Sequence, residues 1–178
     1  MQTPHETMMI GEKVALRRFT RSDIGESYLS WLNDPILMRL SNQRFLRHDR
    51  HSSLQYLQSF DDSPSFFLCV LDRVDHRMIG TMTAYVSPPH GTADMGIMIG
   101  DEATQGCGYG FDAWRTLMTW LLDMQGLRKV TAGTLACNLQ MLKLIRGSGM
   151  QPDGIRRQQE IIEGLPQDLV YFARFRDV

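Results

Sequence analysis

The hydrophobic and polar positions divide the first part of the chain into two helical stretches and two strands. Residues 22–32 have apolar positions at helical spacing, and a second stretch of this kind follows Asp49, a residue type that caps helices. The runs 66–71 and 78–86 are compact and apolar, and the polar turn 72–77 separates them. This arrangement predicts two helices followed by a β-hairpin.

The rest of the chain alternates between strands and helices. Residues 94–100 are predicted as a central strand, and the glycines at both 96 and 100 indicate a bulge or a ligand close to the backbone. From Phe111 to near Gly126 the apolar residues form one stripe of a helix. The remaining predicted elements are a strand at 129–135, a helix that starts at Asn138, and two strands near 155–162 and 168–176.

This order of elements predicts an α+β (mixed α/β) fold, in which helices cover a sheet of six or seven strands. The 178 residues contain no long linker and no repeat, so we expect one domain spanning residues 1–178. The hydrophobic fraction of 43% and the charged fraction of 22% are ordinary for a folded globular protein and argue against disorder.

Charge and cysteine content argue against several classes of protein. The 19 Lys and Arg residues against 20 Asp and Glu residues leave a net charge of -1, whereas a nucleic-acid or membrane-surface binder needs a basic excess. Cys69, Cys107 and Cys137 form no CxxC pair, and His48 and His51 lack further ligands at useful spacing, so we expect no metal site. With no signal-peptide pattern and no apolar run of about 18 residues, we expect a cytoplasmic protein with no membrane partner.

A glycine-rich loop joins the predicted strand 94–100 to the helix after it. Its alternating glycines can turn backbone amides inward, and the helix start adds free N–H groups with a partial positive charge. The combination predicts a phosphate or diphosphate site. No Lys-Ser/Thr pair follows, so the P-loop pattern fails, and Phe111 stands where the dinucleotide fingerprint needs glycine. The loop reads Gln105-Gly106-Cys107-Gly108-Tyr109-Gly110.

This loop matches Q/R-x-x-G-x-G/A, and with it the chain resembles the GCN5-related N-acetyltransferase (GNAT) superfamily. The resemblance covers nearly the whole chain. Residues 16–19 and 31–35 resemble the opening of the ribosomal-protein-alanine acetyltransferase-like branch, and 138–150 resembles the Asn…Leu-Gly-Phe stretch of the second half. It implies a mostly antiparallel sheet, splayed between the strands near 94–100 and 129–135.

The resemblance implies acetyl-CoA (coenzyme A) as the acetyl donor. It implies that strand 97–100 forms main-chain hydrogen bonds with the pantetheine arm, and that Asn138 contacts the cofactor. An Asn at that position is also a good helix N-cap, and both interpretations stay open. The cofactor-binding residues predicted in this way are Met98, Ile99, Gly100, Gln105, Gly106, Cys107, Gly108, Tyr109, Gly110 and Asn138.

Acetyl transfer to an amine requires that the ammonium lose a proton and that the thioester carbonyl be polarised, for which N–H groups near 98–100 are suited. Asp94 is the candidate base, because it lies eleven residues before Gln105, the spacing of the strand carboxylate in several relatives. The alternative is an exposed carboxylate at a strand end. Many relatives carry Tyr where this chain has Ile145, which cannot donate a proton. Either another group protonates the leaving thiolate or solvent alone assists it.

These features predict an N-acetyltransferase in which the amine attacks directly within a ternary complex. The acceptor is open: a protein N-terminus or an amino sugar is favoured, and a small amine remains an alternative. Arg44, Arg47 and Arg50 form a basic stretch in the region that lines the acceptor side in relatives, and would suit an acidic acceptor unless they form a solvated face. The rival is a non-catalytic acyl-CoA-binding or sensory domain, supported by Ile145. A homodimer also stays open.

Overall fold

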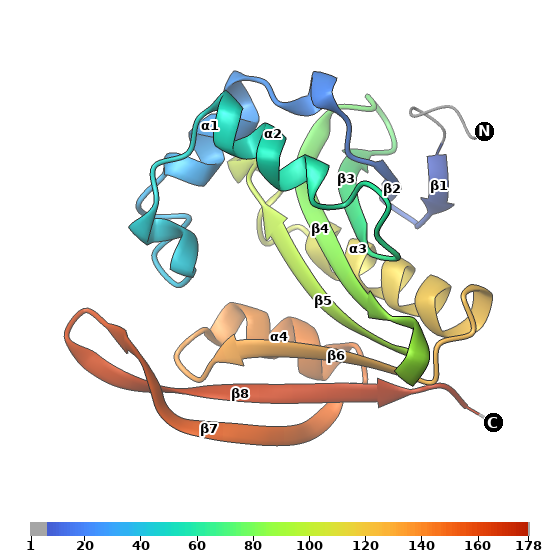
Figure 1. Cartoon of the computed structure of the whole chain (residues 1–178), viewed down its shortest axis with the longest axis vertical. Helices are drawn as coiled ribbons and strands as arrows, with labels where there is room; N and C mark the ends of the chain where they lie inside the picture. Colours follow the sequence, from blue (N-terminus) through green and yellow to red (C-terminus); the bar gives the residue numbers. More distant parts are fainter. Residues whose placement is uncertain (1–6, 178) are drawn as a thin grey trace.

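The computed structural model describes residues 7–177. Residues 1–6, which belong to the start of the chain searched for a signal-peptide pattern, and residue 178 lie outside the description. The structure contains an eight-stranded sheet in the order β1-β2-β3-β4-β5-β6-β8-β7, in which only β5 and β6 are parallel neighbours (Figure 1). The strands are β1 (Thr7–Ile10), β2 (Val14–Arg18), β3 (Phe66–Asp72), β4 (Met78–Ser87), β5 (Thr92–Ile99), β6 (Lys129–Leu135), β7 (Gln151–Ile162) and β8 (Leu165–Phe175).

Helices cover both faces of the sheet. On one face lie α1 (Glu26–Asn33) and α2 (Arg50–Gln58), and on the other lie α3 (Tyr109–Thr119) and α4 (Leu139–Gly147) (Figure 1). α3 continues into a π-helical turn, Trp120–Met124. Short 3₁₀ turns occur at Arg21–Asp23, Asn42–Phe45, Pro88–His90 and Glu102–Thr104.

Two predicted helix starts are confirmed by their caps, and one is corrected. The Asp49 carboxylate accepts the N–H of Ser52 at 2.7 Å, and the Asn138 side chain caps α4. The first helix begins at Glu26 instead of residue 22. Asp23 accepts hydrogen bonds from the Arg17 guanidinium at 2.7 Å, and this pairing keeps it in a separate turn before the helix.

The sheet has eight strands, where the sequence predicts six or seven, because β1 and β2 add an N-terminal hairpin. Its turn is held by Asp112 of α3, a buried carboxylate that accepts the N–H groups of Glu12 at 3.2 Å, Lys13 at 2.8 Å and Val14 at 3.1 Å. The bonding partner lies about a hundred residues away in sequence, so the local pattern does not predict the hairpin.

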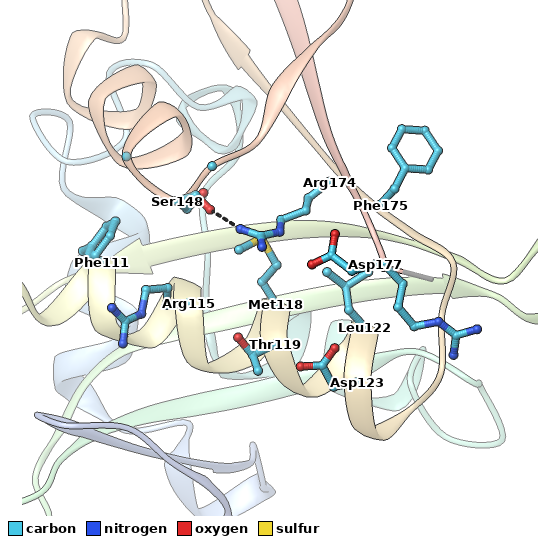
Figure 2. Close-up of a pocket in the computed structure, with 13 residues that line it drawn as sticks. Phe111, Arg115, Met118, Thr119, Leu122, Asp123, Ser148, Arg174, Phe175 and Asp177 are labelled. Carbon is cyan, nitrogen blue, oxygen red and sulfur yellow. Dashed lines mark hydrogen bonds between the residues drawn. The ribbon is translucent and has the colours of Figure 1, made fainter.

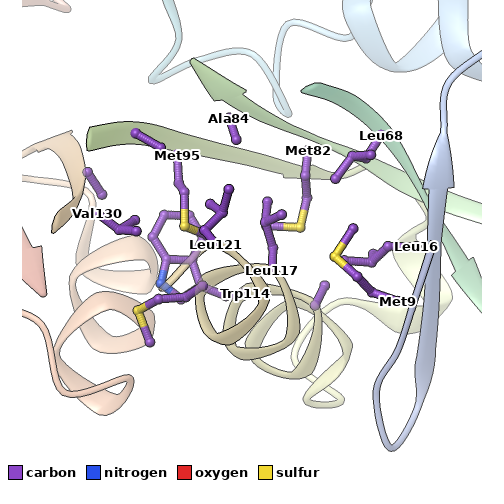
Figure 3. Packing of buried hydrophobic residues seen from close by; sticks show 14 of the residues in the cluster. Met9, Leu16, Leu68, Met82, Ala84, Met95, Trp114, Leu117, Leu121 and Val130 are labelled. Carbon is purple, nitrogen blue, oxygen red and sulfur yellow. The ribbon is translucent and has the colours of Figure 1, made fainter. Parts of the chain in front are cut away.

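Two hydrophobic cores fix the helices to the sheet. In the larger one, Trp114, Leu117 and Leu121 are fully buried against strand residues such as Met82 and Met95 (Figure 3). The smaller core lies beneath α1 and α2, and it includes Phe19 stacked on Phe67 with 4.3 Å between ring centroids. β3 is buried along almost its whole length, and Ala93 and Met95 fix one face of β5 to the larger core, so tight packing sets the position of the β5 edge on that face.

The predicted splay between β5 and β6 is confirmed. The two strands pair only at Thr92 with Lys129, Ala93 with Val130, and Asp94 with Thr131. Both strands continue beyond these pairs, to Ile99 and Leu135, without pairing to each other. The sheet therefore opens directly after Asp94.

Candidate functional site

The loop between β5 and α3 presents a group of unpaired backbone N–H groups. Gly106 and Gly108 have φ values of +71° and +86°, in the left-handed region that favours glycine. Across residues 7–177, the N–H groups of Gly106, Gly108, Tyr109, Gly110 and Phe111 find no hydrogen-bond acceptor. Together with the positive end of α3, these five donors have the arrangement that binds anions in proteins.

A lysine from the other end of the chain adds a positive charge to this loop. Lys13 Nζ donates a hydrogen bond to the Cys107 carbonyl at 2.8 Å and lies 5.4 Å from the centre of the Tyr109 ring. A Cβ atom on Gly108 would stand 3.7 Å from the same ammonium. Lys13 could not be predicted as part of this site from the sequence, because no motif links it to a loop 94 residues away.

The side chains of the loop shape it and leave its amides open. Gln105 Nε2 donates to the Ile99 carbonyl at 3.1 Å, which ties the loop to the end of β5. The Tyr109 hydroxyl donates to Asp72 at 2.9 Å, and this bond raises the pKa of the tyrosine. Cys107 is exposed. These residues therefore offer the anion their backbone, since two of the side chains are engaged elsewhere.

The strand glycines make room for neighbouring side chains. A Cβ on Gly100 would collide with the ring of Trp31 from α1, and one on Gly96 would stand 2.9 Å from Thr83 Oγ1. Gly100 follows the end of β5, and its N–H donates to the Ile79 carbonyl at 3.0 Å. The Gly100 amide is therefore used within the protein, whereas Met98 belongs to the stretch of β5 that has no pairing on the β6 side.

Asp94 lies on the last paired rung before the sheet opens. Thr131 Oγ1 donates a hydrogen bond to its carboxylate at 2.7 Å. The neighbours Ala93 and Met95 point into the larger core, so Asp94 faces the opposite side of the sheet, beside Tyr85 of β4. The structure therefore places this carboxylate at the apex of the splay.

The protonation of Asp94 is shifted by its surroundings. The residue keeps exposed surface, but the atoms around its carboxyl group partly exclude water, and this desolvation raises the pKa of the group. The hydrogen bond from Thr131 acts in the opposite direction and is the smaller effect. A carboxylate with a raised pKa is a stronger proton acceptor than an ordinary surface aspartate.

On the β6 side of the splay, Asn138 follows the strand and lies at the start of α4. Its side-chain oxygen accepts the N–H of Met141 at 3.1 Å, so the interpretation as an N-cap is confirmed. The contact with a cofactor stays a prediction, for which the side-chain NH₂ group is available. Ile145, further along α4, is fully buried in the larger core and has no proton to donate.

The predicted basic stretch is mostly engaged in structural contacts. Arg50 donates to the Ile24 carbonyl at 2.6 Å, and Arg44 donates to the carbonyls of Ser41 at 2.8 Å and Ile161 at 3.1 Å. Two of the three arginines therefore bind main-chain carbonyls, and they do not gather into one anion site.

The connection between α1 and α2 contacts the β7–β8 hairpin. Arg39 pairs with Glu163 at 3.0 Å, and Asn42 donates to Glu160 at 3.2 Å. The α1–α2 connection and the hairpin thus frame the face of the sheet on which Asp94 lies (Figure 1).

A separate cavity of about 510 Å³ lies between α3, the end of α4 and the end of β8 (Figure 2). Arg174 in its wall donates to the Ser148 carbonyl at 3.1 Å. None of the predicted site residues lines it.

In the described residues, no group of three or more His, Cys, Asp or Glu side chains is placed to hold a metal ion. Likewise, none of the helices described is long and apolar enough to cross a membrane.

Comparisons with known proteins agree with this geometry. The family model described as an acetyltransferase (GNAT) domain matches residues 13–151, more than half of the chain. A curated relative, the probable N-acetyltransferase YjcK of Bacillus subtilis, is 22% identical over 134 residues and covers 74% of each chain.

Two solved structures share the fold over nearly their whole length. A ribosomal L7/L12 alpha-N-protein acetyltransferase in complex with coenzyme A has a TM-score of 0.83 and 17% identity, covering 97% of this chain and 99% of its own. The spermidine N-acetyltransferase of Vibrio cholerae, in complex with CoA and spermine, has a TM-score of 0.79 and 18% identity, covering 92% and 96%. At these identities the likeness shows the fold and leaves the acceptor undecided.

Proposed function

Because the chain belongs to the acetyltransferase (GNAT) family and takes acetyl-CoA as its cosubstrate, we propose that it acetylates a primary amine by direct attack within a ternary complex, as a single domain of residues 1–178. One observation carries the proposal: five unpartnered N–H groups and the Lys13 ammonium meet at the start of α3, at the end of a splayed strand. Such a site fits a diphosphate with an arm that extends along the strand.

The residues available to hold coenzyme A fall into two groups. The N–H groups from Gly106 to Phe111, together with Lys13, would bind the diphosphate. Met98 and Ile99 on β5, with Gly100 after them, would follow the pantetheine arm along one wall, and the Asn138 amide would donate from the other. Because the Gly100 N–H is already bonded to Ile79, that residue has only its carbonyl to offer the arm.

Asp94 is the proposed base. The amine must lose a proton before its nitrogen electron pair can attack the thioester carbonyl carbon, and a partly desolvated carboxylate at the apex of the splay suits that step. Thr131 holds the carboxylate in one orientation through the bond to Oδ1. As the new C–N bond forms, the C–S bond breaks and its electron pair leaves with sulfur.

The favoured acceptors are a protein N-terminus and an amino sugar. The two neighbours above are named for a protein N-terminus and for spermidine, so one fold serves unlike amines. The experiment is release of free CoA from acetyl-CoA with three probes: a peptide with a free N-terminus, a nucleotide-linked amino sugar and spermidine. The same peptide with a blocked N-terminus is the matched control. If none of the three amines causes release of CoA, the proposal is contradicted.

The alternative is a non-catalytic domain that binds acyl-CoA, and the burial of the apolar Ile145 at the position of the usual acid supports it. Both functions predict stabilisation of the fold by acetyl-CoA, about 2.7 kcal/mol at a hundredfold excess over Kd. Only the enzyme releases CoA when an amine is added.

The proposed cellular setting is the cytoplasm. The three cysteines are free, as expected in a reducing compartment such as the cytoplasm. A homodimer remains open, and light scattering of the purified protein decides it.

A further inference from the structure

Two glycines face the opening of the splay from opposite walls. Gly96 on β5 and Gly133 on β6 each lie two residues beyond the last paired rung, Asp94 with Thr131. They share the face of Asp94, because side chains alternate along a strand. Three hydroxyl-bearing side chains lie near them. Thr131 donates to Asp94 on the paired position below, Thr83 of β4 occupies the space beside Gly96, and Tyr171 of β8 lies beside Gly133.

Tyr171 of β8 overhangs the glycine of β6. It pairs directly with Gly133, and a Cβ atom on that glycine would stand 3.0 Å from Tyr171 Cε1, 3.2 Å from Cδ1 and 3.7 Å from Cζ. The outer part of the ring is thus closest, so the hydroxyl end leans over β6. Phe172, the next residue, is buried in the larger core, which confirms that Tyr171 points to the opposite face.

The Tyr171 hydroxyl is free, whereas three other tyrosine hydroxyls form hydrogen bonds. Over residues 7–177 it forms no hydrogen bond, although the residue is partly buried. By contrast, Tyr109 donates to Asp72, and the hydroxyls of Tyr56 and Tyr85 bond to each other at 2.6 Å. A free phenol beside the splay is a proton donor without an assigned acceptor.

The charged groups on this face come from three strands. Asp94 of β5 lies at the apex, and Lys129 of β6 pairs with Asp153 at 2.7 Å. Arg156 of β7 places its guanidinium 5.3 Å from the centre of the Tyr171 ring.

We propose that Tyr171 donates the proton that the CoA sulfur receives as it leaves, the role that Ile145 cannot perform. The inference rests on the proposed function. Asp94 takes one proton from the ammonium, the free amine nitrogen then forms the C–N bond, and the second proton that nitrogen loses passes to solvent water. The C–S electron pair moves to sulfur, which takes the Tyr171 hydroxyl proton and becomes the CoA thiol. Water returns the proton from Asp94 to the tyrosine, so one amine proton ends on sulfur.

The first test needs no acceptor amine. A hydroxyl that donates to sulfur stabilises the thiolate, so it lowers the pKa of the thiol of bound CoA. Thiolate absorption is titrated against pH as the difference between the CoA complex and the complex with desulfo-CoA, which cancels the protein's own tyrosines and cysteines. In Tyr171→Phe the pKa of the bound thiol should rise by about 1. An unchanged pKa would overturn the proposal.

Two further variants separate this role from packing. Tyr56→Phe also removes a hydroxyl on this side of the sheet, but that hydroxyl is bonded to Tyr85, and the pKa of the thiol should stay as in the parent. Gly133→Ala keeps the Tyr171 hydroxyl and displaces its ring, so the pKa should rise as in Tyr171→Phe. Equal effects of Tyr56→Phe and Tyr171→Phe would contradict a specific role for Tyr171.

The second test is kinetic. With an amine that supports CoA release, Tyr171→Phe should lower kcat roughly 100-fold and leave KM for acetyl-CoA unchanged. Parent-like kcat would overturn the proposal. If no amine supports release, the proposed function fails, and the thiol titration still decides whether Tyr171 reaches the sulfur.

Discussion

The carboxylate of Asp112 accepts the backbone N–H of Lys13 at 2.8 Å, and this bond joins the N-terminal hairpin to the first turn of α3. It explains how a lysine near the start of the chain comes to lie beside the glycine loop. Asp112 is buried and accepts two further N–H groups of the same turn. The anion site therefore depends on a contact between two distant segments.

Asp112→Ala should destabilise the protein and weaken CoA binding together. Three backbone donors lose their acceptor, at a cost of about 3 kcal/mol, which thermal unfolding measures. Calorimetry should show weaker CoA binding, because Lys13 is no longer held at the loop. Asp123→Ala removes the same charge at an exposed position and should change neither quantity. Normal CoA affinity in Asp112→Ala would contradict the role of the hairpin.

Lys13→Ala should weaken CoA binding about tenfold, or about 1.4 kcal/mol, without unfolding the protein. The ammonium beside the loop amides contributes a charge to the diphosphate site, so the loss should shrink as salt is added. Arg21→Ala removes an exposed positive charge elsewhere and serves as the control. Equal affinities for the parent and Lys13→Ala would show that the diphosphate binds away from this lysine.

Gly108→Glu should abolish the stabilisation by acetyl-CoA, because a carboxylate would occupy the anion site next to Lys13. The residue has a φ of +86°, so any side chain here also strains the backbone, by about 1–2 kcal/mol. Gly108→Gln carries the same strain and nearly the same volume without charge, and it should keep more of the binding. Thermal shift with and without acetyl-CoA measures both, and equal loss would point to strain instead of charge.

Asp94→Asn should lower the rate of acetyl transfer most at low pH, by roughly 100-fold, because there the amine is mostly protonated and needs a base. As pH rises and the free amine becomes abundant, the two pH–rate profiles should converge. A constant ratio of the two rates across the pH range would remove Asp94 from the role of base.

The same variant makes a separate prediction about stability. The folded state raises the pKa of Asp94 above its unfolded value, so any stability from this group is present at low pH and is lost as pH rises through the folded pKa. At neutral pH the charged carboxylate is thus unfavourable in the fold. Asp94→Asn should have a higher Tm than the parent near pH 7, and the gain should vanish once pH falls below the usual range of an aspartate.

The structural elements that depend on only a few neighbouring residues were predicted correctly. The strand at 129–135, the caps at Asp49 and Asn138, and the glycine loop all follow from residue types within one turn or one strand. The confirmed splay came from the family resemblance that the loop motif carried. Local backbone preferences act over a few residues, and these elements depend on little else.

The glycines of β5 show where local reasoning was incomplete. A bulge or a ligand was the expected reason for Gly96 and Gly100, but the structure shows side chains in the space that a Cβ would need, Thr83 at one and Trp31 at the other. Similarly, Arg44 and Arg50 suggested a basic surface and instead bind main-chain carbonyls. Close approach between distant segments leaves no periodic signal in either one.

From its residues alone the chain defines a loop able to bind an anion, because glycine spacing and a helix start are local properties. Which groups surround that loop and the splay was decided only by tertiary packing. Lys13 reaches the loop because Asp112 holds its hairpin, and Tyr171 overhangs the splay because Gly133 has no side chain. Each of these pairs joins strands or helices from far apart in the chain, and their meeting depends on how the whole sheet packs.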